Sequence, residues 1–399
     1  MSINLEEAVA LLLKTTPLSG ETILPLEDSR GMVLAKDIIA GIDQPPFDRS
    51  PLDGYALRSA DTANASADSP VRLSVAGTLC AGDFSAVAIQ SGQAMRIMTG
   101  APVPSGCDCV IKQEETGRER DKVAVYRRLA AHENICFRGE DFKAGSLLLA
   151  AGTKLNAAAI GVLSGAGLAE APALRKPRAA LISTGDELVE PGRGKTLPPG
   201  KIYSSNLAML RARLCELGFP PATAIQTGDD PALAAALVKE TLAQADVLIT
   251  TGGVSVGEKD LFNEVFPLLG AEQIFHGVKI KPGTPAMFSL FEGKPILSLS
   301  GNPFAAAATF ELLGRPLLSA LACDVSLLPV KTFAALLSPY GKTAGTYRFV
   351  RGRLDNGQVV LPEGHSSGQL RSLVGCNCLV EIPPDTPLSK GCTVGVYLL

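Results

Sequence analysis

Six acidic residues lie close to segments whose apolar composition predicts buried strands. They are Asp186, Glu187, Asp229, Asp230, Glu258 and Asp260. Mg²⁺ prefers oxygen ligands and is usually held by one or two carboxylates together with substrate phosphates. With Lys259 and Lys281 nearby, this set predicts a site for phosphate or phosphoanhydride chemistry assisted by a divalent metal. The alternatives are a helix N-cap for Asp230, which we favour, and a solvated turn for Glu258 and Lys259.

Glycine follows three of these predicted strands, at Gly185, at Gly252-Gly253 and at Gly301. Glycine lets the backbone approach a ligand closely and leaves amide N–H groups that hold anionic oxygens. The alternative for any one of them is a tight turn between strand and helix. Three such strand ends together favour a phosphate-binding crevice, because ligands of open α/β sheets bind beyond the carboxyl ends of the strands.

The elements that position these residues alternate between strand and helix. Continuous apolar runs predict strands at 178–184, 246–251 and 295–300, and helices at 206–217, from 231 onward and at 304–313. Buried apolar strands alternating with helices predict a doubly wound, parallel α/β sheet over residues 177–326. Gly218 lies just past the first helix, and Asp230-Pro231 is typical of a helix start.

The rest of the chain predicts three further parts. Residues 46–144 hold short apolar runs broken by Gly and Pro, which predicts a β-rich second domain. Residues 1–45 and 145–176 would form a discontinuous first domain, beginning with an amphipathic helix at 4–15 that Asn4 caps. Residues 327–399 alternate short strands with turns and predict a small β domain. The predicted fold class is therefore multidomain α/β.

Composition excludes several classes of function. The formal charge is −3 and no dense basic run occurs, which argues against nucleic acid or an anionic membrane as the main partner. The acidic N-terminus lacks the basic region of a signal peptide. The longest apolar stretch, 304–323, contains Glu311, Arg315 and Pro316, so we expect no membrane span and a cytoplasmic protein. Walker, Gly-x-Ser-x-Gly and Gly-x-Gly-x-x-Gly motifs are absent, which disfavours covalent and dehydrogenase mechanisms.

Nine cysteines are spread along the chain, which for an unexported protein predicts reduced thiols. Cys107 and Cys109 are separated by one residue, as are Cys376 and Cys378, so each pair lies on one face of a strand. A zinc site would need further ligands, and the chain has only three histidines. We therefore favour core packing over metal binding for both pairs.

Seven motifs occur together in a specific order and spacing. They are Pro46-Phe47-Asp48-Arg49-Ser50-Pro51-Leu52-Asp53-Gly54-Tyr55-Ala56, Arg96-Ile97-Met98-Thr99-Gly100-Ala101-Pro102-Val103-Pro104, Arg138-Gly139-Glu140-Asp141, Ser183-Thr184-Gly185-Asp186-Glu187-Leu188, Thr251-Gly252-Gly253-Val254-Ser255-Val256-Gly257, Lys281-Pro282-Gly283 and Gly301-Asn302-Pro303. The ordered set resembles the molybdopterin molybdenumtransferases, the family that includes the enzymatic C-terminal domain of gephyrin. The resemblance spans essentially the whole chain.

The resemblance implies a reaction and an assembly. The enzyme would bind molybdopterin-AMP, cleave its phosphoanhydride in the presence of molybdate and Mg²⁺, and release AMP and the molybdenum cofactor. It would be an elongated homodimer of four-domain subunits, with each active site in the α/β domain of one subunit closed by the second domain of the other. Molybdopterin adenylyltransferase and apo-molybdoenzymes are the implied protein partners.

The same resemblance assigns roles to individual residues. The implied catalytic residues are Asp53, Glu187, Asp229 and Asp260, of which Asp229 and Asp260 would bind the metal. The implied substrate-binding residues are Thr99, Asp141, Gly252, Gly253, Ser255, Lys281, Gly301, Asn302 and Pro303. Asp53, Thr99 and Asp141 would come from the second domain and the others from the α/β domain.

Five positions depart from the family pattern. Ser300 replaces a proline, and Cys136, Phe137, Thr284 and Thr346 stand where the family often has basic residues. Arg348, Arg371 or Lys279 would be close enough in sequence to compensate for the lost charge. The alternatives to an active molybdenumtransferase are therefore a weakly catalytic molybdopterin-binding scaffold and a tungstate-selective paralogue.

Overall fold

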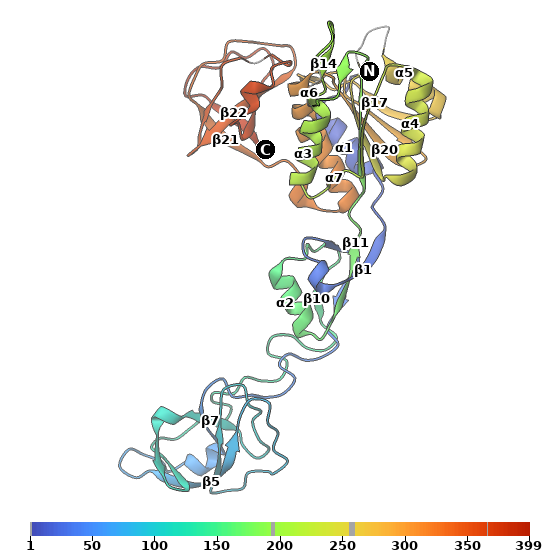
Figure 1. The fold of residues 1–399 in the computed structure, drawn as a ribbon. Helices are drawn as coiled ribbons and strands as arrows, with labels where there is room; N and C mark the ends of the chain where they lie inside the picture. The colour runs from blue at the N-terminus through green and yellow to red at the C-terminus, as the bar shows by residue number, and fades with distance from the viewer. Residues whose placement is uncertain (1, 193–195, 255–259, 365) are drawn as a thin grey trace. The chain divides into compact units, whose positions relative to one another are not determined.

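The computed structural model describes residues 2–192, 196–254, 260–364 and 366–399 (Figure 1). Two compact units make up the fold. The larger unit joins Met1–Thr22 to Ala173–Leu399, and the smaller unit is Ile23–Pro172. The larger unit contains an α/β domain and a C-terminal β domain.

The α/β domain is built on a sheet with the strand order β15-β12-β16-β20-β19-β17. The strands are β12 (Ala179–Thr184), β15 (Thr223–Thr227), β16 (Val247–Thr251), β17 (Glu272–His276), β19 (Met287–Phe291) and β20 (Lys294–Leu299). Strands β15, β12, β16 and β20 are parallel, as predicted. Strand β19 pairs antiparallel with both of its neighbours, β20 and β17, so the prediction of a parallel sheet was wrong at this edge. The reason is the Glu292-Gly293 turn, in which both residues have positive φ, as tight hairpins require.

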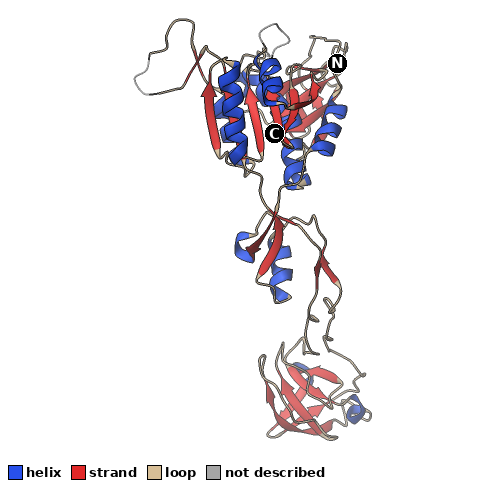
Figure 2. Cartoon of the chain, turned by 90° about the vertical axis from the view of Figure 1, so that its right-hand side faces the viewer, coloured by secondary structure: helices blue, strands red, loops and turns tan. Residues whose placement is uncertain are grey.

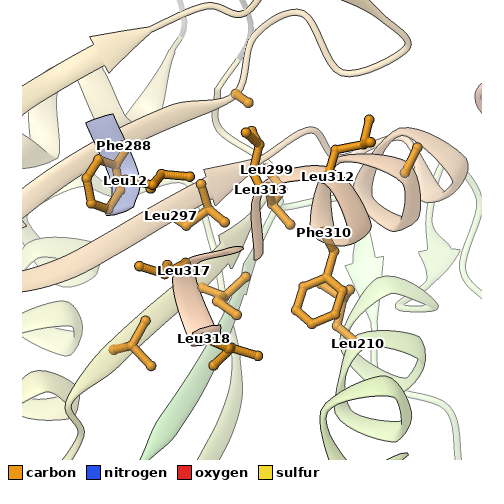
Figure 3. Packing of buried hydrophobic residues seen from close by; sticks show 14 of the residues in the cluster. Leu12, Leu210, Phe288, Leu297, Leu299, Phe310, Leu312, Leu313, Leu317 and Leu318 are labelled. Atoms are coloured by element: carbon orange, nitrogen blue, oxygen red, sulfur yellow. The ribbon is translucent and has the colours of Figure 1, made fainter. Parts of the chain in front are cut away.

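Helices pack on both faces of this sheet (Figure 2). They are α1 (Leu5–Thr15), α3 (Asn206–Glu216), α4 (Pro231–Gln244), α5 (Leu261–Leu269), α6 (Pro303–Thr309) and α7 (Arg315–Ala322), with a π-helical turn at Phe310–Gly314 between the last two. Ala179 and Leu181 of β12 face α1, α3, α6 and α7, whereas Ala180 and Ile182 face α4 and α5. This alternation is the period of two that a strand buried on both faces requires. Figure 3 shows the first of these two cores.

Helix termini follow local chemistry that the sequence displays. Asn4 caps α1 by accepting from the Glu7 amide, at 2.7 Å. Asp230 caps α4, with Pro231 as its first residue, which confirms the cap interpretation of Asp230. Gly218, just past α3, has a φ of 84°, which a residue with a side chain rarely adopts.

Helix α1 lies in a different part of the structure from the one predicted. Ala8 and Leu12 are fully buried in the α/β core, and Ile3 bridges Val278. The helix therefore packs with the larger unit and not with a first domain that spans 1–45. Its amphipathic pattern predicts a buried face but does not identify the surface that covers this face.

Among the described residues, one helix, Pro303–Ala322, is long and apolar enough to cross a membrane by composition alone. Of the window that passes this test, 89% is buried inside the fold. Its apolar side chains therefore form part of the core of the α/β domain.

The C-terminal β domain is a small barrel with the strand order β18-β22-β23-β21-β25-β24, closed by pairing of β22 with β24. The strands are β18 (Ile280–Lys281), β21 (Lys331–Leu336), β22 (Tyr347–Asp355), β23 (Gln358–Val360), β24 (Cys378–Ile382) and β25 (Thr393–Leu398). Strand β18 belongs by sequence to the α/β domain, and its pairing with β22 joins the two domains.

The smaller unit is β-rich, as predicted. Its main sheet has the order β7-β4-β6-β5-β9-β8, formed by β4 (Gly54–Leu57), β5 (Val71–Leu79), β6 (Gln93–Ile97), β7 (Cys109–Lys112), β8 (Thr116–Glu119) and β9 (Lys122–Val125). The remaining elements are β1 (Glu21–Pro25), β2 (Val33–Leu34), β3 (Ile38–Ile39), β10 (Leu147–Leu149), α2 (Ala157–Gly165) and β11 (Glu170–Leu174).

One cysteine of each pair packs in the core of a β domain, whereas the other lies before the strand begins, so the prediction that each pair lies on one face of a strand was wrong. Cys109 is buried in the smaller unit and Cys378 in the barrel. Burial raises the pKa of Cys107 to about 12 and that of Cys378 to about 11, so these thiols stay protonated at neutral pH. The described residues include no group of three or more His, Cys, Asp or Glu side chains placed to hold a metal ion.

Candidate functional site

A cleft of about 1450 Å³ lies in the larger unit, lined by residues from the carboxyl ends of β12, β16 and β20. The strand register places these ends side by side. Ser183 pairs with Thr251, and Thr251 pairs with Leu299. The predicted crevice is therefore present, and the barrel contributes its opposite wall through Lys342, Arg348 and the segment 366–368.

Glycines form the wall of this cleft nearest the sheet. Gly252 has a φ of 88°, and a Cβ there would lie 2.4 Å from the Thr184 carbonyl oxygen. Gly301 packs beside Gly252. The Gly185 amide donates to the Thr227 carbonyl oxygen at 3.2 Å, and the Gly252 amide donates to the Leu299 carbonyl oxygen at 3.1 Å. The prediction that the amides after these strands hold an anion was therefore wrong for these two glycines. At Gly252 glycine is required, because a Cβ would collide with the Thr184 backbone.

Carboxylates line one side of the cleft. Asp186 and Asp229 accept hydrogen bonds from each other's backbone amides, each at 3.2 Å. Both residues are exposed to the cleft, as is Glu187, and Glu264 also contributes to the lining. The reciprocal bonds fix the two aspartates side by side while leaving a carboxylate oxygen of each available to a ligand.

Asp260 has a different environment. Its carboxylate caps α5 through the Phe262 amide, and the residue is 3% exposed. Burial raises its pKa to about 6. Within the described residues its Oδ2 atom has no hydrogen-bond partner, and His276 Nε2 lies 3.8 Å from it. The described lining of the cleft includes Asp229 but not Asp260. Ser255, Glu258 and Lys259 lie outside the described residues.

Positive charge lines the opposite side of the cleft. Lys281 of β18 pairs in register with Arg348 of β22, and both line the cleft together with Lys342. The Arg348 guanidinium lies beside the hydroxyl of buried Tyr340 and acts to lower its pKa, although burial, the larger effect, raises it. Arg348 Nε is buried without a hydrogen-bond partner among the described residues.

The positions that depart from the family pattern lie in different places. Of the three basic residues considered as compensation, Arg348 is in the described lining of the cleft, whereas Lys279 and Arg371 are not. Thr284 lines the cleft and donates to the Ile280 carbonyl oxygen at 2.7 Å. Thr346 is not in the described lining.

The Gly301-Asn302-Pro303 turn joins β20 to α6 and lines the cleft. Ser300 Oγ accepts from the Asn302 amide at 3.3 Å, a bond that the usual proline could not make. Asn206 donates to the Gly301 carbonyl oxygen at 2.7 Å. The substitution to Ser300 therefore adds a bond that stabilises the turn.

Several residues of the site were not predicted. Arg351 is completely buried, with its guanidinium carbon 3.7 Å from the centre of the Phe304 ring. It donates to the carbonyl oxygens of Ser366 and Gln369 and so holds the loop that lines the cleft. Asn206 and Tyr203 were missed as well. The available signals in the sequence were an arginine (Arg351) and an aromatic residue (Tyr203) next to apolar residues, but neither signal identifies the group that the side chain contacts.

In the smaller unit, two of the predicted residues meet. Asp53 Oδ1 accepts from the Thr99 amide at 2.8 Å and from its hydroxyl at 2.7 Å, and these bonds lower the pKa of Asp53. Asp141 donates its amide to the Gln44 carbonyl oxygen. Cys136 pairs with Arg49 through backbone bonds.

Three family descriptions match successive parts of the chain. Residues 3–167 match the MoeA N-terminal region (domain I and II), residues 180–320 match a probable molybdopterin binding domain, and residues 334–399 match the MoeA C-terminal region (domain IV).

Relatives and solved structures match over almost the full length. The molybdopterin molybdenumtransferase of Staphylococcus aureus (strain COL) is 34% identical, covering 99% of this chain and 95% of the relative. That of Staphylococcus epidermidis (strain ATCC 12228 / FDA PCI 1200) is 33% identical, covering 96% and 92%. The crystal structure of a molybdopterin biosynthesis MoeA protein from Pyrococcus horikosii superposes with a TM-score of 0.87 at 33% identity, covering 100% and 99% of the two chains.

Proposed function

The chain belongs to the MoeA family of molybdopterin molybdenumtransferases, and we propose that it inserts molybdate into adenylylated molybdopterin with release of AMP. It thus acts in molybdenum cofactor biosynthesis, with molybdopterin and molybdate as its substrates. The proposal also includes four more specific statements. The substrate is molybdopterin linked to a nucleotide, the reaction requires Mg²⁺, two subunits share each active site, and the protein acts in the cytoplasm.

The single observation that carries the proposal is the presence of carboxylates and cations in the lining of one cleft. Asp186, Glu187 and Asp229 lie on the sheet side, whereas Lys281 and Arg348 lie on the barrel side. A substrate with a phosphoanhydride would be held by the cations at its phosphate oxygens and by the carboxylates through a bridging metal. Charge that develops on the leaving phosphate would be stabilised by groups already in position.

The donor set of the carboxylate wall fits Mg²⁺, which prefers hard oxygen ligands. Asp229 and Asp186 would hold the ion together with phosphate oxygens, and the ion would neutralise charge on the phosphoanhydride. Asp260, which the family resemblance pairs with Asp229, is buried and outside the described lining of the cleft, so its part in metal binding stays a prediction. Asp229→Ala should therefore reduce AMP release far more than it reduces folding stability, and excess EDTA should abolish AMP release in the unchanged protein.

A homodimer with shared sites would unite two groups of residues. Asp53 and Thr99 form a hydrogen-bonded pair in the smaller unit, whereas Asp229 lies in the larger unit. If the smaller unit of one subunit completes the cleft of its partner, mixing Asp53→Ala with Asp229→Ala should restore part of the activity, because one site of each heterodimer carries both wild-type residues. A monomer by light scattering, or no rescue after subunit exchange is verified, would refute the shared site.

The test of the function itself is incubation with molybdopterin-AMP, Mg²⁺ and molybdate, with AMP measured by chromatography. Molybdate-dependent AMP release that EDTA stops is the expected result. Tungstate replaces molybdate in a parallel series, because the two oxyanions have the same charge and nearly the same size. Pterin binding without AMP release at any oxyanion concentration would instead indicate a scaffold.

A further inference from the structure

The described lining of the cleft includes two aromatic side chains, Tyr203 and Phe349. Phe349 is 1% exposed and packs in the core, whereas Tyr203 is 41% exposed. Beside Tyr203, Ile202 is 54% exposed and also lines the cleft. Consecutive side chains of a strand point to opposite faces, so Tyr203 alone offers an exposed aromatic surface in a cleft otherwise dominated by charged and small residues.

Backbone and side-chain bonds hold this surface next to the carboxylates. Tyr203 belongs to β14 (Ile202–Tyr203), which pairs in parallel with β13 (Leu188–Val189) directly after Glu187. The Ile202 amide donates to the Glu187 carbonyl oxygen at 2.9 Å. Lys201 Nζ donates to the Asp186 carbonyl oxygen at 2.6 Å. A ligand whose phosphates lie at the carboxylate wall would therefore have its next chemical group close to Tyr203.

We propose that Tyr203 is a platform on which a flat nitrogen-containing ring of the substrate stacks. The inference rests on the proposed function, because only a ring-bearing phosphate ester needs both a charged cleft and an aromatic face. Two rings share this chemistry, the adenine of the nucleotide part and the pterin. Tyrosine stacks on either with little selectivity, since both offer a π face.

The test compares Tyr203→Ala, Tyr203→Phe and Tyr347→Ala. Tyr347 is the matched control, because it is also 41% exposed but lies outside the described lining of the cleft. Three probes are titrated calorimetrically, namely AMP, ribose 5-phosphate, which carries the sugar phosphate without a base, and free pterin. The chain has no tryptophan, so quenching of tyrosine emission provides a second readout for the ring-bearing probes.

Loss of the stacked ring at a partly exposed tyrosine should weaken binding by Tyr203→Ala by roughly fivefold to tenfold, the lower end of the range for stacking on an aromatic side chain. The loss should affect AMP if adenine stacks there, or pterin if the pterin does, and should spare ribose 5-phosphate. Tyr203→Phe should bind like the unchanged protein, because the ring is retained.

Three results would overturn the platform. They are unchanged affinity of Tyr203→Ala for both ring-bearing probes, an equal loss for ribose 5-phosphate, and failure of Tyr203→Phe to restore binding. The outcome is independent of turnover. If the unchanged protein binds AMP through Tyr203 but never releases AMP from molybdopterin-AMP, the transferase proposal fails and the platform stands. If it turns over normally and the three variants bind alike, the platform fails and the transferase stands.

Discussion

Replacing Asp260 with asparagine should stabilise the α/β domain at neutral and alkaline pH. Burial raises the pKa of this carboxyl from 3.8 to about 6, so the folded protein binds its proton more tightly than the unfolded chain does. Ionisation of Asp260 therefore does not lower the free energy of unfolding below pH 4. The loss of unfolding free energy grows as the pH rises from 4 to 6 and is complete above pH 7. The difference in pKa corresponds to about 3 kcal/mol at about 1.4 kcal/mol per pH unit.

Asparagine is a suitable replacement because it removes the charge and keeps the helix cap. Its amide oxygen accepts from the Phe262 amide as the carboxylate does, and asparagine is as good an N-cap as aspartate. Asp230→Asn is the matched control, because Asp230 also caps a helix but is exposed to solvent.

The assay is urea unfolding at pH 4 and pH 8, with hydrogen exchange of α5 peptides as the local readout. Asp260→Asn should gain up to about 3 kcal/mol over the unchanged protein at pH 8 and almost nothing at pH 4. Asp230→Asn should show no such dependence on pH. An equal effect at both pH values, or destabilisation at pH 8, would refute the reasoning. If Asp260 serves the reaction, the stabilised variant should also lose turnover, which is the trade-off expected of a buried charge kept for function.

Two further predictions concern arginines. Arg348→Gln should raise the molybdate or pterin-nucleotide concentration needed for half-maximal AMP release by roughly tenfold to a hundredfold, because a charge-assisted hydrogen bond contributes about 1.5–3 kcal/mol. Arg353→Gln is the control and should change this concentration little, because Arg353 is on the same strand but outside the described lining of the cleft. The Arg348 effect should shrink with added salt, and equal behaviour of the two variants would contradict it. Arg315→Met should destabilise the larger unit by about 1–3 kcal/mol in urea, because the carbonyl oxygens of Leu327 and Leu398 lose their donor, whereas Glu311 keeps its ion pair with Arg213; no measurable loss would show that these bonds are dispensable.

Features that depend on neighbouring residues in the chain were predictable from the sequence. The Asp230-Pro231 start of α4, the Asn4 cap and the glycine after α3 follow from backbone chemistry within four residues. The strands that end in glycine were also predictable, because fully apolar runs bounded by glycine match buried parallel strands. Convergence of Asp186 and Asp229 then follows from parallel pairing of β12 with β15.

Features that depend on distant parts of the chain were not predictable in the same way. The antiparallel pairing of β19 with β20 follows from the two-residue turn at Glu292-Gly293, which is too short for a crossover, but the pairing of β17 with β19 joins segments that local patterns do not pair. The contact of α1 with the α/β core depends on shape complementarity across hundreds of residues. The contribution of Arg348 to the cleft depends on pairing of β22 with β18, which local patterns do not encode.

The departures from the family pattern bear on activity through the position of charge. Thr284 and Thr346 lack the positive charge that the family often has there, yet the strand register places Arg348 directly beside Lys281 on the barrel side of the cleft. An oxyanion responds to the potential at its oxygens, and this potential depends on where a guanidinium lies rather than on which residue number carries it. The hydroxyl of buried Tyr340 interacts with the Arg348 guanidinium. A preorganised cation of this kind holds an oxyanion with relocated charge, and molybdate-dependent AMP release decides between a catalyst and a scaffold that only binds the pterin.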